Sequence, residues 1–500
     1  MVNRHARLQP SYVPTKGGGA VRASKTLAAV SVALMMVTAA CGRQDAGSPP
    51  GSQFPATWTV YGGNPEHNAV FDVPGDAQPW VRDGVSWQFR EAMGLPLDGG
   101  PQDENVLGYL AASVKTTQMI GNAVGVTAVD GKIFAESDWN RAYALDAKTG
   151  KKLWETELMS EAMGNPVVAD GLVFVGVGDT GFSFSNVQRY AAGGQVNRGM
   201  GYGAVSALDE RTGKEVWHFS TVGEDMPSVV YLKGRIYFGN GDGHMYALDA
   251  KTGKPAWVTQ VGGFDSMSSA NYWHDPRTGR DLVVAGFSAP NYLYAFDAET
   301  GKVAWKATVP GVYNTGMGDN TPTVDSQRGL VFQDSVVDFD QATKTSDLAL
   351  FGVDASSGKV TWETKLGRGP SPLAYKAAIS MVRDGVVYVG NPATGFLTAL
   401  DETSGRVLWR TDLGTYTWKG KEYHIQNRGG PVFYHGVLYQ AAGAYVFAVD
   451  PASGRVLSRF DAGGRYGIVN PVIVGGTMYL GNSWGWVTAT PMSKVHPGGG

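Results

Sequence analysis

Eight polar side chains stand just ahead of short apolar segments, where they could bind a small ligand. Amide and carboxylate groups can form hydrogen bonds to such a ligand, and a lysine or arginine can meet an anion. Their types predict a polar binding site, and they leave the identity of any catalytic residue open. The candidate ligand-binding residues are Asn122, Asn165, Asp225, Asp319, Asn320, Lys376, Arg428 and Asn470.

Methionines lie near the same segments of the chain. A group of thioethers can hold a flat apolar ligand or a soft cation such as Cu(I). These methionines do not share one register against the turn that follows each of them, so we interpret them as apolar lining, with a copper site as the alternative. They are Met119, Met163, Met226, Met267 and Met317.

Several other chemistries lack their residue patterns. The eight His residues are scattered without metal-ligand spacing, and a single Cys excludes a Cys-based metal site. The stretch from Gly239 to Gly243 has the pattern of a hairpin turn rather than of a phosphate loop. The formal net charge is −3 and no basic patch is present, so we expect no nucleic-acid partner.

The strands that must position the polar residues are marked by one sequence motif, which occurs seven times and is called the phrase below. Its clearest copy is Tyr246-Ala-Leu-Asp-Ala-Lys-Thr-Gly-Lys254, and six copies carry a Trp eight residues after the Asp. The Asp residues are 63, 40, 48, 57, 47 and 49 positions apart. A period in this range is typical of a propeller. The Asp can bind backbone N–H groups of the turn, the Gly permits a positive φ, and the Trp fills the space between blades.

The number of blades follows from the strands around each phrase. Each Trp strand leads into two inner strands and then into the next phrase, which gives four strands per blade. The first Trp strand, at Trp87, has no phrase before it, and the last blade lacks a final strand. We therefore predict an all-β, eight-bladed propeller of four-stranded antiparallel blades, in which the N-terminal strand completes the last blade and removes an open edge.

Four long insertions are expected on one face of this propeller. Residues 90–117 and 415–427 connect the outer strand of one blade to the inner strand of the next, and residues 179–203 and 333–347 connect the second strand to the third. In a blade whose consecutive strands run in opposite directions, both kinds of connection lie at the same end of the strands. Because binding usually resides in loops on a rigid scaffold, we expect the binding site on this loop-rich face.

The phrase, in an eight-bladed arrangement, resembles the repeat of the pyrroloquinoline quinone (PQQ) propeller superfamily. The resemblance covers roughly residues 58–490, including an opening segment at Trp58. That superfamily contains quinoprotein alcohol dehydrogenases and also non-catalytic lipoproteins similar to the BamB subunit of the outer-membrane assembly machine. The repeat therefore predicts the fold more sharply than the function.

The resemblance implies PQQ with Ca²⁺ as a cofactor to be considered. Residues 193–209 are similar to a quinoprotein segment, but Gln195 stands where that family has a metal-binding Glu, and the vicinal Cys pair of many members is missing. Asp319 and Asp347 are candidates for the catalytic Asp by location alone. Lys376 and Arg428 could meet quinone oxygens or another anionic ligand.

The N-terminal residues have the pattern of an export signal. Residues 1–41 combine a basic start, a short apolar stretch and small residues before Cys41, which resembles a lipidation site. We expect residues 42–54 to be a flexible tether, 55–490 to be the propeller and 491–500 to be a flexible tail. These features predict a lipid-anchored protein on the extracytoplasmic face of a membrane, without an internal disulfide.

The expected function is a non-catalytic binding or scaffold module of the cell envelope. It would act as a monomer that binds an envelope protein or a small ligand on the loop-rich face. The alternative is a divergent PQQ-dependent oxidoreductase acting on alcohols or sugars. The missing Cys pair and Gln195 favour the first hypothesis, and the similarity of residues 193–209 favours the second.

Overall fold

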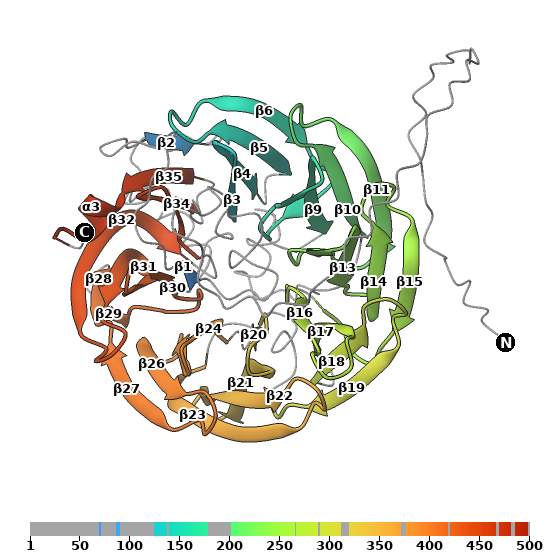
Figure 1. Ribbon diagram of the computed structural model, residues 1–500. Helices are drawn as coiled ribbons and strands as arrows, with labels where there is room; N and C mark the ends of the chain where they lie inside the picture. Colours follow the sequence, from blue (N-terminus) through green and yellow to red (C-terminus); the bar gives the residue numbers. More distant parts are fainter. Residues whose placement is uncertain are drawn as a thin grey trace, which may run out of the picture.

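The computed structural model describes most of the chain from residue 125 onward. The described residues are 70–71, 87–90, 125–137, 140–178, 202–265, 267–288, 291–311, 320–371, 377–418, 421–466, 470–481 and 486–498. They form eight sheets set around a central axis like the blades of a propeller, and one separate two-stranded sheet (Figure 1). The predicted all-β, eight-bladed architecture is confirmed. No helix among these residues is long and apolar enough to cross a membrane.

The first four blades follow one another along the chain. Blade 1 contains β3 (Val126–Val129), β4 (Lys132–Ser137), β5 (Arg141–Asp146) and β6 (Lys152–Glu157). Blade 2 contains β8 (Val167–Ala169), β9 (Leu172–Gly178), β10 (Tyr202–Asp209) and β11 (Glu215–Val222), with β7 (Glu161–Ala162) added beside β9. Blade 3 contains β12 (Val230–Leu232), β13 (Arg235–Gly239), β14 (His244–Asp249) and β15 (Pro255–Gln260). Blade 4 contains β16 (Asn271–His274), β17 (Asp281–Phe287), β18 (Tyr292–Asp297) and β19 (Val303–Thr308).

The last four blades keep the same order with local additions. Blade 5 contains β20 (Thr323–Asp325), β21 (Leu330–Asp340), β22 (Thr345–Asp354) and β23 (Val360–Pro370). Blade 6 contains β24 (Ser380–Arg383), β25 (Val386–Gly390), β26 (Phe396–Asp401) and β27 (Val407–Asp412), followed by a hairpin of β28 (Thr415–Trp418) and β29 (Lys421–His424). Blade 7 contains β30 (Val432–Tyr434), β31 (Val437–Val449) and β32 (Val456–Tyr466), and β1 (Val70–Phe71) pairs with β30. Blade 8 contains β33 (Val472–Val474), β34 (Thr477–Gly481), β35 (Trp486–Pro491) and β2 (Trp87–Arg90).

The ring is closed as the sequence predicted. Strand β2 pairs antiparallel with β35, with Trp87 opposite Ala489, so the N-terminal strand forms the outer edge of the last blade. The indole Nε1 of Trp87 donates to the carbonyl oxygen of Ala147 in blade 1 at 2.9 Å. This contact ties blade 8 to blade 1.

Each repeat phrase performs the structural task expected of it. In blade 3, Oδ1 of Asp249 accepts the backbone N–H of Thr252 at 2.9 Å and its hydroxyl at 2.7 Å. Gly253 takes φ +67°, and a Cβ there would lie 2.5 Å from the ring of Trp217. Trp217, from the outer strand of blade 2, donates its Nε1–H to the carbonyl oxygen of Ala250 at 3.1 Å. The phrase of one blade therefore receives the Trp of the blade before it.

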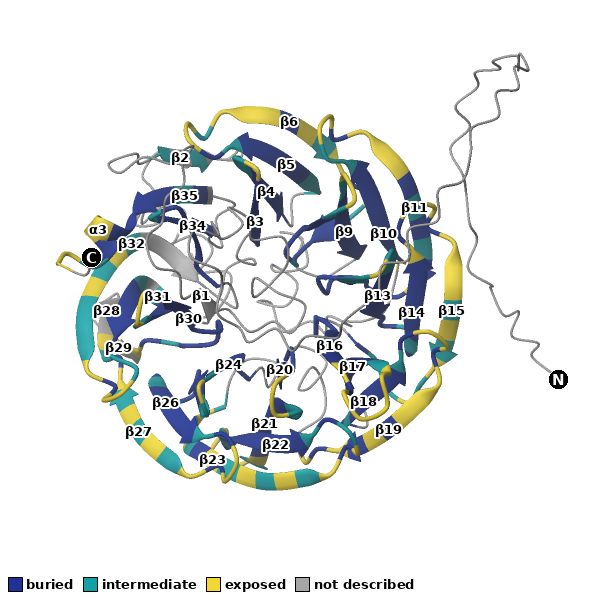
Figure 2. Cartoon of the chain, in the orientation of Figure 1, coloured by how far each residue is buried: buried dark blue, intermediate teal, exposed yellow. Residues whose placement is uncertain are grey.

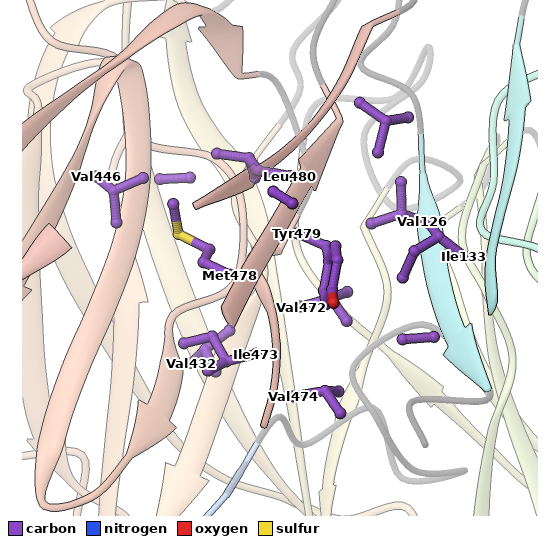
Figure 3. Close-up of a cluster of buried hydrophobic side chains, with 14 of the residues drawn as sticks. Val126, Ile133, Val432, Val446, Val472, Ile473, Val474, Met478, Tyr479 and Leu480 are labelled. Carbon is purple, nitrogen blue, oxygen red and sulfur yellow. The ribbon is translucent and has the colours of Figure 1, made fainter. Parts of the chain in front are cut away.

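The hydrophobic core is divided among the spaces between blades. The inner strands are buried almost throughout, whereas the outermost strands alternate between exposed and partly buried residues (Figure 2). One cluster combines blades 7, 8 and 1, with Tyr479 and Leu480 of β34 packed between Val446 and Val126 (Figure 3). Comparable clusters fill the other spaces between neighbouring blades.

Two of the four long insertions lie within the described residues. The hairpin between β21 and β22 remains paired as far as Asp340 and Thr345, and the β28–β29 hairpin follows blade 6. The insertions at 90–117 and 179–203 fall largely outside the described residues. At the C-terminus, where a flexible tail was expected from residue 491, the helix α3 (Met492–Val495) buries Met492 and Val495.

Candidate functional site

Hydrogen bonds pass from blade to blade just before the inner strands of blades 2 to 5, and from blade 7 to blade 8. The backbone N–H of Asn165 donates to Oγ of Ser228 at 2.7 Å, and that of Ser228 to Oγ of Ser269 at 3.0 Å. The series continues from Ser269 to Oγ1 of Thr321 at 3.1 Å. In blade 7, the N–H of Gly430 donates in the same way to Oδ1 of Asn470 at 3.1 Å. We call these positions the mouth ring.

Two of the predicted ligand-binding residues belong to this ring. Asn165 is buried, and its Nδ2 donates to the carbonyl oxygen of Val126 in blade 1 at 2.8 Å. Asn165 therefore joins blade 2 to both of its neighbours. Asn470 is also buried, and its Oδ1 accepts the backbone N–H of Gly430, which precedes the first inner strand of blade 7. Both amides hold the blades in register at the end of the channel.

Asp225 lies in a buried polar network between blades 2 and 3. Its carboxylate accepts hydrogen bonds from the hydroxyl of Thr221 and from Nδ2 of Asn240, the latter at 2.6 Å. Burial raises the pKa of Asp225 well above its usual range, and the nearby carboxylates of Asp242 and Glu224 raise it further. The hydrogen bonds oppose that rise without cancelling it.

Two further predicted residues, Asn320 and Arg428, meet at the start of blade 6. Oδ1 of Asn320 accepts the backbone N–H of Ala377 at 3.1 Å, and Nε of Arg428 donates to the carbonyl oxygen of Ala377 at 3.1 Å. The next N–H, of Ala378, donates to Oδ2 of Asp334 at 2.7 Å. Residues of blades 5, 6 and 7 thus bring a carboxyl group, an amide and a guanidinium around one short backbone segment.

Asp334 is the titratable group of this cluster. Its side chain is 2% exposed, and burial raises its pKa to about 7. The N–H of Ala378 and the charge of Arg428 both favour the ionised form, so the pKa would be higher still without them. A carboxyl group that changes charge near pH 7, beside a buried arginine, is suited to proton transfer next to an anion.

Glu136 occupies the same position in blade 1 as Asp334 does in blade 5. Each is the fifth residue counted from the one that faces the repeat Asp, since Lys132 pairs with Asp146 and Leu330 with Asp354. Glu136 is 1% exposed, and burial raises its pKa to about 8, with the N–H of Gly164 opposing the rise. The other six blades carry a glycine or alanine here: Gly176, Gly239, Gly286, Gly390, Ala441 and Gly481.

The small residues have a steric cause. A Cβ at Gly176 would collide with the carbonyl oxygen of Asp225, and one at Gly390 would lie 2.5 Å from that of Asn427. The segment leading into the next blade packs against this position. Glu136 and Asp334 therefore break a steric rule of the repeat, in two blades that lie opposite each other among eight. Sequence analysis missed both residues, although an alignment of the second strands of all blades would have found them.

The remaining predicted residues are placed differently. Asn122, Asp319, Lys376 and the lipidation candidate Cys41 lie outside the described residues, as does Gln195. Asp347 of β22, one of two candidates for a catalytic Asp, forms an ion pair at 3.1 Å with Arg368 of the neighbouring strand β23. Asp347 does not lie opposite Asp334: it pairs with Val337, three residues further along β21, whereas Asp334 pairs with Leu350.

Comparison with known proteins identifies the family. The family model described as outer membrane protein assembly factor BamB, a PQQ-repeat model, matches residues 85–191, 201–391 and 269–492. The chain belongs to this PQQ-repeat propeller family. The suspected membership is thereby confirmed. A quinohemoprotein alcohol dehydrogenase from Pseudomonas putida HK5 has the same fold, with a TM-score of 0.50 at 15% identity over 79% of this chain and 76% of that one.

Two curated relatives match almost the whole chain. A tetrathionate hydrolase of Acidithiobacillus ferrooxidans is 38% identical over 455 residues, which cover 89% of this chain and 87% of the relative. A tetrathionate hydrolase of Acidianus ambivalens is 37% identical over 465 residues, which cover 89% and 85%. The expected scaffold function was wrong, because these relatives are enzymes. The oxidoreductase alternative was also wrong, because they are hydrolases.

The described residues include only part of the segments that the resemblance linked to PQQ and Ca²⁺. Among the described residues, no group of three or more His, Cys, Asp or Glu side chains could hold a metal ion. The amides of Asn165, Asn320 and Asn470 form hydrogen bonds to backbone groups of neighbouring blades.

Proposed function

We propose that this chain hydrolyses tetrathionate at the loop-rich end of its central channel. The observation that carries this proposal is the identity of 38% over 89% of the chain to a tetrathionate hydrolase. The cluster around Asp334 and Arg428 supports it, because it offers a cation and a titratable group at the ends of the inner strands.

The substrate sets two chemical requirements. Tetrathionate is a dianion with a sulfonate at each end and two divalent sulfurs between them. Binding requires donors or cations for the sulfonates, and Arg428 supplies a guanidinium whose planar N–H groups suit such oxygens. Hydrolysis of a sulfur–sulfur bond then adds the OH of water to one sulfur and returns the remaining proton to the sulfur that leaves.

Asp334 is suited to donate that proton. Because burial raises its pKa to about 7, the carboxyl group is neutral in acidic solution. A neutral carboxyl group does not repel a dianion, and it can protonate the departing sulfur as the bond breaks. We therefore assign Asp334 as the general acid, and expect kcat to fall as the pH rises through about 7.

The test is the disappearance of tetrathionate, followed by ion chromatography with the purified propeller. We expect turnover by the wild type, and a loss of about 100-fold or more in kcat for Asp334→Asn, the usual scale for removing a general acid. Arg428→Lys should retain more activity than Arg428→Gln, since it keeps the charge. Asp130→Asn, at an exposed turn, is the matched control.

The outcomes separate the function from the residues assigned to it. Absence of turnover by the wild type across the acidic and neutral range would overturn the proposed hydrolysis. Full activity of Asp334→Asn, together with turnover by the wild type, would remove Asp334 from the mechanism while leaving the function in place.

We further propose that the protein is exported and held at a membrane surface by lipid on Cys41, as a monomer. The basic, apolar and small-residue pattern of residues 1–41 supports this proposal. Labelling of cells with a radioactive fatty acid should mark the wild type and leave Cys41→Ser unlabelled. Equal labelling of both would contradict the assignment, and light scattering of the purified chain tests the oligomeric state.

A further inference from the structure

Three methionines share one position in three successive blades. Met163, Met226 and Met267 each stand two residues before a member of the mouth ring, namely Asn165, Ser228 and Ser269. Sequence analysis found no common register, because it counted from the following turn. The hydrogen bond to the next blade defines the register, and by that measure these three agree. The remaining two methionines of the earlier group, Met119 and Met317, lie outside the described residues.

The three side chains pack against one another although they come from blades 2, 3 and 4. They form a buried cluster of their own, with exposed fractions of 4%, 1% and 6% in chain order. Blades diverge from the axis, so side chains of three successive blades can meet only where the inner strands converge (Figure 1). The cluster therefore lies at the channel, beside the start of the inner strands.

This cluster differs in kind from the cores between the blades. Those cores consist almost entirely of aliphatic and aromatic side chains of neighbouring blades, with Met245 as the one methionine of the two compared, whereas this cluster contains thioethers alone. A Leu or Val would supply similar apolar volume with a better-defined shape. A thioether adds a polarisable sulfur and a flexible chain that adapts to a partner. The composition thus suggests a soft contact surface in addition to packing.

The same ring position carries a charge on the other side of the channel. Arg428 stands two residues before Gly430, whose N–H makes the corresponding hydrogen bond to Asn470. It belongs to blade 7, which is opposite blade 3 and therefore opposite Met226. The same position of the repeat thus carries thioether sulfurs in blades 2 to 4 and a guanidinium in blade 7, on the opposite side of the channel. Tetrathionate has the matching composition, with divalent sulfurs in its middle and sulfonates at its ends.

We infer that Met163, Met226 and Met267 form a thioether surface that recognises the divalent sulfurs of polythionates. This inference rests on the proposed hydrolysis and names the part of the substrate that each side of the channel recognises. Arg428 attracts a sulfonate, and the methionines favour anions that contain divalent sulfur. Met163 and Met267 keep slightly more exposure than the fully buried Met226, so they are the two members chosen for substitution.

A comparison of two anions of equal charge separates the contribution of the methionines from that of Arg428. Tetrathionate contains two divalent sulfurs, whereas dithionate is a dianion of two sulfonates with none. In the variant Met163→Leu/Met267→Leu, we expect KM for tetrathionate to rise about two- to tenfold, the range that sulfur contacts support. The inhibition constant of dithionate should stay unchanged. Met245→Leu, in the core between blades 3 and 4, is the control and should change neither value.

The result can fail in two distinguishable ways. Equal changes for the two anions, or no change for either, would overturn the role of the methionines while the wild type still hydrolyses tetrathionate. If the wild type has no hydrolytic activity, the proposed function fails. The ratio of the dissociation constants for the two anions, measured by calorimetry in wild type and variant, still decides whether the methionines select divalent sulfur. Either single Met→Leu variant replaces the double one if the latter does not fold.

Discussion

Replacement of Asp334 by Asn should change how stability depends on pH, independently of any activity. Burial raises the pKa of Asp334 from its ordinary value of 3.8 to about 7. Well below pH 3.8 the carboxyl group is protonated in both the folded and the unfolded chain. Between these values the unfolded chain releases a proton that the folded chain keeps, so the free energy of unfolding falls as the pH rises. Above pH 7 the loss is complete, and at about 1.4 kcal/mol per pKa unit it amounts to ~4 kcal/mol.

The Asn variant lacks this titration and retains the oxygen that accepts the N–H of Ala378. We therefore expect the wild type to lose ~4 kcal/mol relative to Asp334→Asn between pH 4 and pH 8. Urea unfolding of both proteins at intervals of one pH unit, followed by Trp fluorescence, measures the difference directly. All other titrating groups, including Glu136, are common to the two proteins and cancel in the comparison.

The same measurement on Asp130→Asn shows what an exposed carboxylate contributes. Parallel stability curves for the wild type and Asp334→Asn would refute the reasoning, because they would mean that Asp334 ionises alike in the folded and unfolded chains. A wild type that gains stability with rising pH relative to Asp334→Asn would refute it more strongly. That sign would require the charged form to be favoured by folding, as in an ion pair that outweighs burial.

Three further outcomes are expected. Glu136→Gln should show the same sign as Asp334→Asn, with the loss in the wild type complete above pH 8, because burial raises the pKa of Glu136 to about 8. Gly253→Ala should lower the melting temperature more than Gly234→Ala: both have positive φ, but only the first Cβ meets a ring, that of Trp217. Trp87→Ala should cost roughly 3 kcal/mol and speed amide exchange in blade 8, since it removes the contact that closes the ring.

The sequence predicted the fold well because its repeat contains the contacts that join the blades. The Asp of each phrase shapes a turn, its Gly leaves room for an indole, and the Trp of the preceding blade fills that room, as Asp249, Gly253 and Trp217 show. Closure was predictable for the same reason. A Trp strand at Trp87 without a phrase of its own had to join a blade that lacked its last strand.

The candidate site was predicted only in part. The starts of the inner strands were located correctly, so Asn320 and Arg428 were named before the structure placed them around Ala377. Glu136 and Asp334 were missed because they lie inside apolar strands, where a polar residue attracts no attention unless every blade is aligned. The function could not be predicted from the repeat, because the repeat residues form the contacts between blades. Those contacts are the same whatever reaction takes place at the channel end.

In a repeat protein, a residue that departs from the type found in the other repeats points to a task beyond packing. At the fifth position of the second strand, six blades use glycine or alanine, which bury no charge and leave room for the next segment. Glu136 and Asp334 bury a carboxyl group there, which costs several kcal/mol at neutral pH by the linkage worked out above. Packing alone is satisfied more cheaply by the small residues, so the carboxyl groups need a reason beyond the fold. For Asp334 the proposed reason is proton donation beside Arg428, and the opposite position of Glu136 makes it the next side chain to test for a share in the same proton balance.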